Sequence, residues 1–373
     1  MNVISLLAVI VLPAHPTEVE RGAAEELRDG IHRLTGAEER IVTEAETDAG
    51  DFYVGATRMA AAVASAEWKY DEILVAPVGD GVVLAGHPER GPFYAVDEYL
   101  EKVCGVRWWT STESCYPRLK AMPVPGKAIR HAPKIAYRET YYLDGFTNAL
   151  FKVRSKGNFS SRTRYMFHPL EFVPTAMGGD HRLYYYRGRG SAYHSFFEVL
   201  PPKVYLERHP EWYSLVDGKR VAKQLCLTNE EMKRAYIAET LRLLAEDPAV
   251  DFISVSQNDW NGSCQCEKCR AVVEAEGAES GLYLRFANEV AEAVERVLPK
   301  VKVDTFAYQF TVRPPKLTKP RHNVVVRLCS IGCAVNEPYA TRRLDDGFSD
   351  DLAVWSKIAP GRLFVWDYTV DFW

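Results

Sequence analysis

Apolar residues in the first third of the chain come in short runs around one long amphipathic stretch. The run from Ile4 to Leu12 predicts a buried first strand. Residues 17–34 predict a helix that Gly36 ends, because apolar side chains recur at helical spacing, at Val19, Ala23, Leu27, Ile31 and Leu34. Further predicted elements are strands at 51–55, 72–76, 82–85 and 106–110, a turn at Asp80-Gly81 and a helix over 93–103. Residues 1–125 therefore predict a non-catalytic α/β domain, which a proline-containing linker follows.

From about residue 133 the pattern changes to apolar runs that alternate with amphipathic stretches, which is typical of parallel (β/α) units. The predicted strands lie at 135–142, 192–197, 224–228, 252–256, 301–308, 324–329 and 363–368, and the long helices at 229–245 and 282–297. A closed TIM-type (β/α)8 barrel has eight strands. Residues 126–373 therefore predict a catalytic barrel that looks truncated after about the seventh strand, so the chain is expected to be a fragment.

Composition and charge argue against several classes of partner. The chain has 46 Lys+Arg against 50 Asp+Glu and a net charge of −4, which gives no basis for binding nucleic acid. No apolar run reaches the ~18 residues that a membrane span needs. The first apolar run lacks the basic flank and cleavage site of a signal peptide, and an exported or periplasmic parent protein stays open. Aromatic residues make up 12% of the chain, and such rings pack cores or stack on sugars.

Polar and aromatic side chains recur where the predicted barrel strands end. The strand over 252–256 is followed by Gln257, Asn258 and Asp259, and the strand over 301–308 ends at Tyr308. Further groups on or after the strands are His194, Arg327, Glu337, Trp366, Asp367 and Tyr368. Because barrel strands aim their carboxyl ends at one face, this recurrence predicts a sugar-cleaving pocket.

Glycosidic cleavage assigns different roles to these groups. It needs an acid that protonates the leaving oxygen, and a second group that is a nucleophile or steadies the substrate's own N-acetyl oxygen. Asp259 is the candidate acid or base, Asn258 and Tyr308 are candidates for the acetamido group, and Glu337 or Asp367 is the candidate second carboxylate. The candidates for substrate binding are Gln257, His194, Trp366, Tyr368 and Arg327. An Asn-Asp pair after a strand is equally consistent with an Asx turn or a helix cap, and the aromatic residues with core packing.

Three cysteines follow Asp259 at C-x-C-x-x-C spacing. Thiolates from Cys264, Cys266 and Cys269 can reach one zinc ion, with Cys226, Cys329 or Cys333 as the fourth ligand. Such an ion would be structural and would brace the loop after Asp259, so catalysis itself is expected to require no cofactor. The alternative is a loop of reduced or disulfide-paired cysteines.

Several of these stretches resemble glycoside hydrolase family 163, long catalogued as a domain of unknown function. They are Ser256-Gln-Asn-Asp259, the cysteine segment 264–269, Leu284-Arg-Phe-Ala-Asn288, Ala307-Tyr-Gln309 and the segment 323–330. The N-terminal stretches 90–96 and 105–109 are similar to the non-catalytic domain that precedes the barrel in α-glucuronidases and β-hexosaminidase relatives. The resemblance implies an endo-β-N-acetylglucosaminidase that cleaves N-glycans of glycoproteins with retention and substrate assistance. Asp259 falls where related hexosaminidases keep an acidic pair, whose first member is Asn258 in this sequence, and this difference leaves open whether Asp259 is the acid or the group that polarises the acetamido group.

Two other functions stay open at this point. An α-glucuronidase-like hydrolase would need a basic residue in its pocket, for which Arg327 and Arg138 are candidates. A non-catalytic glycan-binding protein is favoured by the missing eighth strand and by the Asn-Asp pair.

Overall fold

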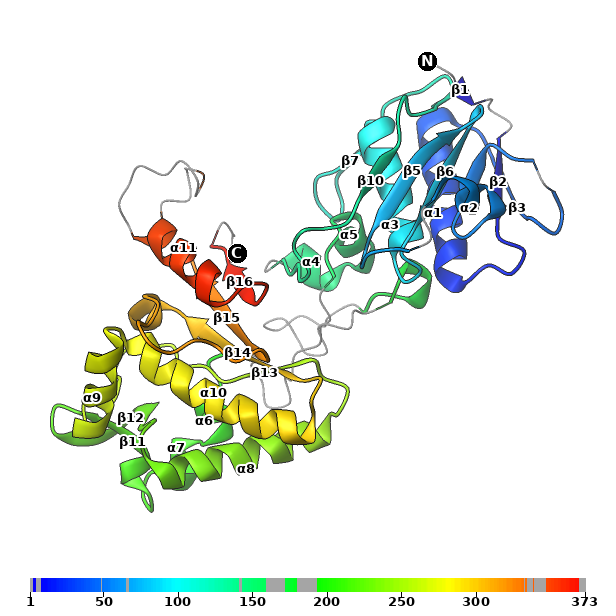
Figure 1. The fold of residues 1–373 in the computed structure, drawn as a ribbon. Helices are drawn as coiled ribbons and strands as arrows, with labels where there is room; N and C mark the ends of the chain where they lie inside the picture. The colour runs from blue at the N-terminus through cyan, green and yellow to red at the C-terminus, as the bar shows by residue number, and fades with distance from the viewer. Residues whose placement is uncertain are drawn as a thin grey trace. The chain divides into compact units, whose positions relative to one another are not determined.

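A computed structural model describes residues 3–4, 8–47, 49–64, 67–140, 143–158, 172–179, 193–331, 333, 338 and 347–368. The chain divides into two compact units, an N-terminal unit of residues 1–181 and a C-terminal unit of residues 182–372 (Figure 1). Each unit combines helices with a sheet that contains parallel strands, which confirms the predicted α/β class. The domain border near residue 125 was predicted from a change in the sequence pattern, and it stays a prediction.

The N-terminal unit is built on a six-stranded mixed sheet with strand order β10-β5-β6-β4-β2-β3. Its strands are β2 (Val9–Leu12), β3 (Arg40–Thr43), β4 (Phe52–Val54), β5 (Ile73–Val78), β6 (Gly81–Gly86) and β10 (Ile129–His131). β5 and β6 form the antiparallel hairpin that the Asp-Gly turn predicts, whereas β2, β3, β4 and β6 run parallel. The sequence pattern missed β3 and β10, because each is short and carries too few apolar residues to show a period.

Helices cover both faces of this sheet. Successive strand residues point to opposite faces, so Ile10 and Leu12 pack in one core cluster and Val11 packs in another. Helices α1 (Glu18–Thr35) and α3 (Gly91–Glu98) cover the first face, and α2 (Arg58–Val63) covers the second. The smaller elements are β1 (Val3–Ile4), η1 (Tyr99–Val103), β7 (Arg107–Trp108), β8 (Ser114–Cys115), β9 (Met122–Pro123), α4 (Leu143–Thr147), α5 (Ala149–Arg154) and η2 (Thr175–Met177).

Local capping explains why α1 begins and ends where the sequence predicts. The Thr17 side chain accepts a hydrogen bond from the Glu20 backbone N–H, and the Glu20 carboxylate accepts one from the Thr17 backbone. At the other end Gly36 adopts a φ of 80°, and its N–H donates to the His32 carbonyl. Both signals are readable from sequence because they depend only on residues close together in the chain.

The C-terminal unit contains a four-stranded parallel sheet in the order β13-β14-β15-β16. These strands are β13 (Phe252–Ser254), β14 (Lys302–Ala307), β15 (Val324–Cys329) and β16 (Leu363–Trp366), and they confirm the last four predicted barrel strands. The helices are α6 (Phe196–Val199), α7 (Pro202–Tyr205), α8 (Glu230–Glu246), α9 (Glu267–Glu276), α10 (Glu279–Val297) and α11 (Phe348–Ile358), with short turns η3 (Pro210–Trp212) and η4 (Gln309–Thr311).

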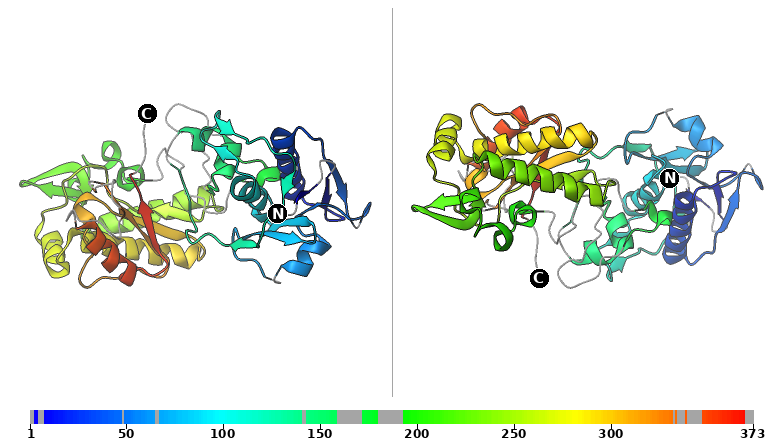
Figure 2. Two further views of the ribbon diagram at one scale, coloured as in Figure 1. Left: turned by 90° about the horizontal axis from the view of Figure 1, so that it is seen from above. Right: turned by 90° about the horizontal axis from the view of Figure 1, so that it is seen from below.

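The long helices pack as their apolar stripes require. α10 lies along β14 and β15 and beside α8, as Figures 1 and 2 show. Its buried Phe286, Val290 and Val294 share a core cluster with Val303 and Val326 of the sheet. None of the described helices is both long enough and apolar enough to cross a lipid bilayer.

The first two predicted barrel strands form no strand over their described residues, and the third pairs differently from a barrel strand. Residues 135–140 form no strand and belong to the N-terminal unit, where the Asn158 side chain bonds the backbone of Arg138 and Ala136 instead of a neighbouring strand. Residues 193–195 lead into helix α6.

The third predicted strand, at 224–228, overlaps one strand of an antiparallel hairpin. Residues 224–225 end β12 (Lys219–Leu225), which pairs with β11 (Tyr213–Val216). Asp217 and Gly218 make its turn with φ values of 50° and 77°, the left-handed conformation that two-residue hairpin turns need. The Asp-Gly signal was present in the sequence, but the alternation of strands and helices around it favoured a parallel assignment.

Candidate functional site

Asp259 follows the C-terminal end of β13 and presents an exposed carboxylate. Its Oδ1 accepts a hydrogen bond of 2.9 Å from the Tyr308 hydroxyl, which follows the end of the neighbouring strand β14. The Nε2 atom of His194 lies 3.7 Å from the same oxygen. The Asp259 side chain is 57% exposed, so a ligand can reach the carboxylate while Tyr308 donates to it and His194 lies beside it. The structure therefore brings together three residues that the sequence assigned to one pocket.

The contacts around this cluster orient its rings. The Nδ1 atom of His194 lies 2.7 Å from the Gln257 carbonyl oxygen, which can only accept, so Nδ1–H donates and Nε2 faces Asp259. The Gln309 amide donates to the Tyr308 hydroxyl at 2.9 Å. His194 and Gln309 have φ values of 56° and 51°, an uncommon left-handed backbone for residues with a side chain. Such strain is typical of positions where the surrounding structure holds a functional group in place.

Burial and the Asp259 carboxylate change the acidity of Tyr308. Burial is the larger cause, the hydrogen bond to Asp259 adds to it, and together they raise the pKa of Tyr308 to about 12. Burial also raises the pKa of Tyr368, with Cys329 and Tyr308 adding smaller effects. Both phenols therefore stay protonated at neutral pH and act as hydrogen-bond donors.

Asn258 and Gln257 are buried and contact protein atoms. The Asn258 amide donates to the Lys223 carbonyl at 2.9 Å, and its Oδ1 accepts from the Phe197 backbone at 3.3 Å. Gln257 donates to the Tyr308 carbonyl and to the hydroxyl of Thr311. In this conformation the two amides position the backbone that leads into Asp259, and neither side chain is presented to an acetamido group.

Two residues that sequence reasoning missed complete this part of the site. Gln224 is fully buried; its Oε1 accepts from the Asn258 backbone N–H, and its Nε2 donates to the carbonyl oxygens of Asn258 and Trp260. Trp260, directly after Asp259, is 47% exposed. The signals available in the sequence were the polar Gln224 directly before the apolar run 225–227 and the Asp259-Trp260 pair.

An aromatic cluster continues from His194 to the end of β16. The Phe306 ring lies 5.2 Å from His194 and 6.1 Å from Trp366, between ring centroids. Trp366 stacks on Tyr368 at 6.3 Å and meets the edge of Tyr193 at 4.7 Å. The structure thus links the predicted sugar-binding aromatic residues Trp366 and Tyr368 to the Asp259 cluster.

Arg327 occupies a different position from the one that a substrate ligand needs. Its side chain is 6% exposed, and its Nε donates to the fully buried Asp304 carboxylate at 3.2 Å. The guanidinium carbon lies 5.0 Å from the centre of the Tyr193 ring and 5.7 Å from that of Trp366. Arg327 therefore supports the aromatic cluster from the protein interior.

Of the two candidates for the second carboxylate, the structure describes only Asp367. Asp367 Oδ1 accepts from the Ser330 hydroxyl at 3.4 Å, which puts it at the ends of β15 and β16. Glu337 lies outside the described residues.

The cysteine segment gathers in space with one cysteine from the hairpin. The Sγ atoms of Cys226, Cys264, Cys266 and Cys269 all lie within 4.8 Å of one another. The sequence left three cysteines open as the fourth member, and the structure brings Cys226 into the group. Within the described part of the chain, Cys329 and Cys333 are outside this group.

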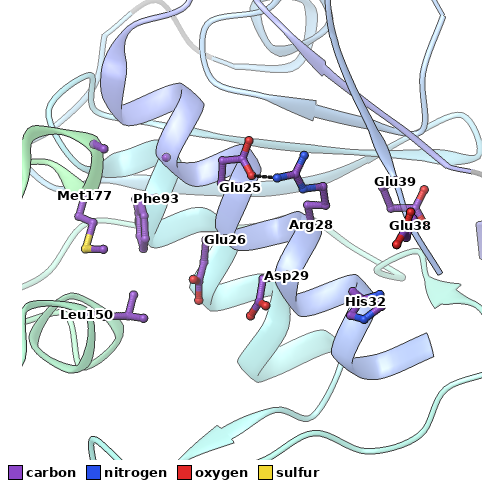
Figure 3. Close-up of a pocket in the computed structure, with 12 residues that line it drawn as sticks. Glu25, Glu26, Arg28, Asp29, His32, Glu38, Glu39, Phe93, Leu150 and Met177 are labelled. Atoms are coloured by element: carbon purple, nitrogen blue, oxygen red, sulfur yellow. Dashed lines mark hydrogen bonds and ion pairs between the residues drawn. The ribbon is translucent and has the colours of Figure 1, made fainter. Parts of the chain in front are cut away.

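A pocket of about 840 Å³ lies in the N-terminal unit, where sequence analysis predicted no catalytic residues. Figure 3 shows apolar side chains of Phe93, Leu150 and Met177 at one end and the acidic Glu38 and Glu39 at the other. Glu39 is buried, and among the described residues neither carboxylate oxygen has a hydrogen-bond partner. Burial, with a smaller effect of Asp51, raises the pKa of Glu39 to about 7.

This pKa makes Glu39 destabilising at neutral and higher pH. A carboxyl whose pKa is higher in the folded state than its usual 4.5 binds more protons when folded, so stability falls as pH rises from there to about 7. Glu39→Gln removes this penalty. We expect the free energy of unfolding of this variant, relative to that of the parent protein, to be about 1–2 kcal/mol higher at roughly pH 8 than at roughly pH 5. Urea unfolding at both pH values measures the difference. Glu38→Gln, on the exposed neighbour, is the control, and a pH-independent difference for Glu39→Gln would contradict the assignment.

Comparisons with known proteins give one family and several distant structures. The GH20 β-N-acetylhexosaminidase from Streptomyces coelicolor A3(2) is 12% identical, with a TM-score of 0.47, covering 98% of this chain and 72% of that one. The GH115 4-O-methyl-α-glucuronidase BtGH115A, with specificity for decorated arabinogalactans, is 13% identical, with a TM-score of 0.47, covering 87% of this chain and 45% of that one. CpGH89 from Clostridium perfringens is 11% identical, with a TM-score of 0.39, covering 83% and 39%.

The chain thus spans less than half the length of the GH115 and GH89 structures. No curated protein matches the sequence. The family described as "Domain of unknown function (DUF4838)" matches residues 108–373, which is more than half of the chain. The protein therefore belongs to the DUF4838 family.

Proposed function

We propose that the protein is a retaining glycoside hydrolase that cleaves glycans containing N-acetylglucosamine, acting as an endo-β-N-acetylglucosaminidase on N-glycans. The observation that carries this proposal is the exposed Asp259 carboxylate at the end of the parallel sheet, held by Tyr308 at 2.9 Å and flanked by His194. A carboxyl group held at a fixed, exposed position can exchange a proton with a glycosidic oxygen, which is the role of the acid/base group in glycosidic cleavage. The resemblance of segments 256–269 and 307–309 to glycoside hydrolase family 163 supports the same activity.

The chemistry follows from the groups around Asp259. In substrate-assisted cleavage the acetamido oxygen of the sugar attacks its own anomeric carbon as the bond to the leaving oxygen breaks. Asp259 in its acid form donates its proton to that leaving oxygen, and as a carboxylate it later accepts a proton from the attacking water. Tyr308 keeps its proton through this cycle, because its pKa is raised to about 12, and so continues to orient the carboxylate.

The remaining groups bind the sugar and polarise its acetamido group. The exposed ring of Trp260 and the rings of Trp366 and Tyr368 offer faces on which a pyranose stacks. The group that polarises the acetamido nitrogen is Asp367 or Glu337, the second carboxylate that the sequence offers.

The structure offers less support for an α-glucuronidase. The two arginines considered for binding a uronic acid are both paired with buried carboxylates, Arg327 with Asp304 and Arg138 with Asp71. Arg138 also belongs to the N-terminal unit, whereas Asp259 belongs to the C-terminal unit.

Digestion of a complex N-glycoprotein by the full-length protein tests the proposal. We expect mass spectrometry to detect released glycans that lack one core N-acetylglucosamine, and a protein that retains that sugar. Glucuronic-acid-decorated polysaccharide is the comparison substrate. Release of uronic acid alone would favour the α-glucuronidase, and tight binding of an intact glycan with no product would favour a binding protein.

A further inference from the structure

We propose that Cys226, Cys264, Cys266 and Cys269 bind one zinc ion through four thiolates, and that this ion ties the β11–β12 hairpin to the segment that follows Asp259. The proposal is independent of the glycosidase activity. It rests on the geometry of the sulfur atoms, on the elements that carry them and on the donors around them.

The separation of the sulfur atoms matches a metal-bound arrangement. Cys226 Sγ lies 3.7 Å from Cys266 Sγ and 4.0 Å from Cys269 Sγ. Zinc–sulfur bonds of ~2.3 Å at tetrahedral angles place ligand sulfurs about 3.8 Å apart. A disulfide instead requires ~2.05 Å between two sulfurs. All four cysteines are unpaired, and their Sγ atoms form one group within 4.8 Å.

The four ligands come from two segments that are distant in sequence. Cys226 directly follows β12, whereas Cys264 lies in the loop after Asp259, Cys266 caps α9 and Cys269 lies in its first turn. The positive end of the α9 dipole is therefore next to two thiolates, which it stabilises. Three of the four cysteines are no more than 4% exposed, which leaves no open position for a substrate and indicates a structural ion.

Donors surround the sulfur atoms as expected for a site with excess negative charge. Zinc with four thiolates carries a net charge of about −2, which neighbouring donors must offset. The Leu215 N–H donates to Cys264 Sγ at 3.3 Å, and the Arg220 guanidinium lies 3.8 Å from the same sulfur. The Thr228 hydroxyl lies 3.2 Å from Cys269 Sγ.

The ion would close a loop that already lies against the hairpin. The Gln265 N–H donates to the Leu215 carbonyl at 2.7 Å, and the Trp260 indole N–H donates to the Lys223 carbonyl at 2.6 Å. With Cys226 and Cys264 on one metal, both ends of the segment that carries Asp259 are fixed, by β13 at its start and by zinc at its end.

Elemental analysis of the full-length protein, purified without chelator or added zinc, tests the proposal. We expect about one zinc per chain in the parent protein and in Cys329→Ser, which removes a buried cysteine outside the group. Cys226→Ser and Cys269→Ser are expected to lose most of the zinc. Iron in place of zinc, with the visible absorption of an iron–thiolate centre, would overturn the identity of the metal.

Cobalt substitution keeps the test decisive if a cysteine variant does not fold. Parent protein reconstituted with Co²⁺ is expected to show strong thiolate-to-cobalt charge transfer and the visible bands of a tetrahedral site. Alkylation after denaturation, without reductant, is expected to label all four cysteines once the metal is chelated. Absence of zinc together with disulfides among these four residues, or with no cobalt spectrum, would refute the proposal.

Discussion

Asp259→Asn is expected to lower kcat on an N-acetylglucosamine-containing glycan by roughly 10²–10⁴-fold, the usual contribution of a general acid. The substitution keeps the shape of the side chain and an oxygen that can accept from Tyr308, so the cluster with His194 is retained. What it removes is the proton that goes to the leaving oxygen. Substrates with a good leaving group need less protonation, and their hydrolysis is expected to fall by a smaller factor.

Steady-state kinetics of the full-length protein measures this effect, and Asp350→Asn is the matched control. Asp350 is an exposed carboxylate near the start of α11 in the same unit, and its substitution is expected to leave kcat unchanged. Equal melting temperatures for the two variants would show that lost activity does not come from unfolding. An Asp259→Asn variant that retains the parent rate on all substrates would remove Asp259 from the mechanism.

Arg327→Met is expected to destabilise the C-terminal unit by about 3–5 kcal/mol, because it leaves the buried Asp304 carboxylate without its guanidinium partner. The contacts of the guanidinium with the rings of Tyr193 and Trp366 are lost as well. The shift of the urea midpoint measures the loss. A substrate ligand would behave differently, since its removal would raise KM at unchanged stability.

A second variant separates the buried charge from the packing. Asp304→Asn combined with Arg327→Met removes both charges, and the pair is expected to be more stable than Arg327→Met alone. If the double variant is less stable than the single variant by the full cost of Asp304→Asn, the two residues are not coupled and the ion pair does not explain the loss.

Local sequence signals predicted helices α1 and α3 and four of the six strands of the N-terminal sheet. The Gly36 end of α1 and the Asp80-Gly81 hairpin each depend on residues close together in the chain. The last four strands of the C-terminal unit were equally readable, since buried parallel strands are apolar runs. The same rule predicted strands over 135–142 and 192–197, whose described residues form none, and gave the strand over 224–228 a parallel partner, because an apolar run does not reveal which partner its backbone will bond.

The sequence by itself determined the α/β class, the place of Asp259 after a parallel strand, and the cysteine spacing behind it. These features are set by periodicity and by neighbours in the chain. Only the tertiary structure decided which distant residues meet: His194 and Tyr308 at Asp259, Cys226 with the cysteine segment, and Arg327 with Asp304 beneath the aromatic rings. The physical reason is that burial and pairing of polar groups depend on strand register and loop closure, which no local pattern encodes.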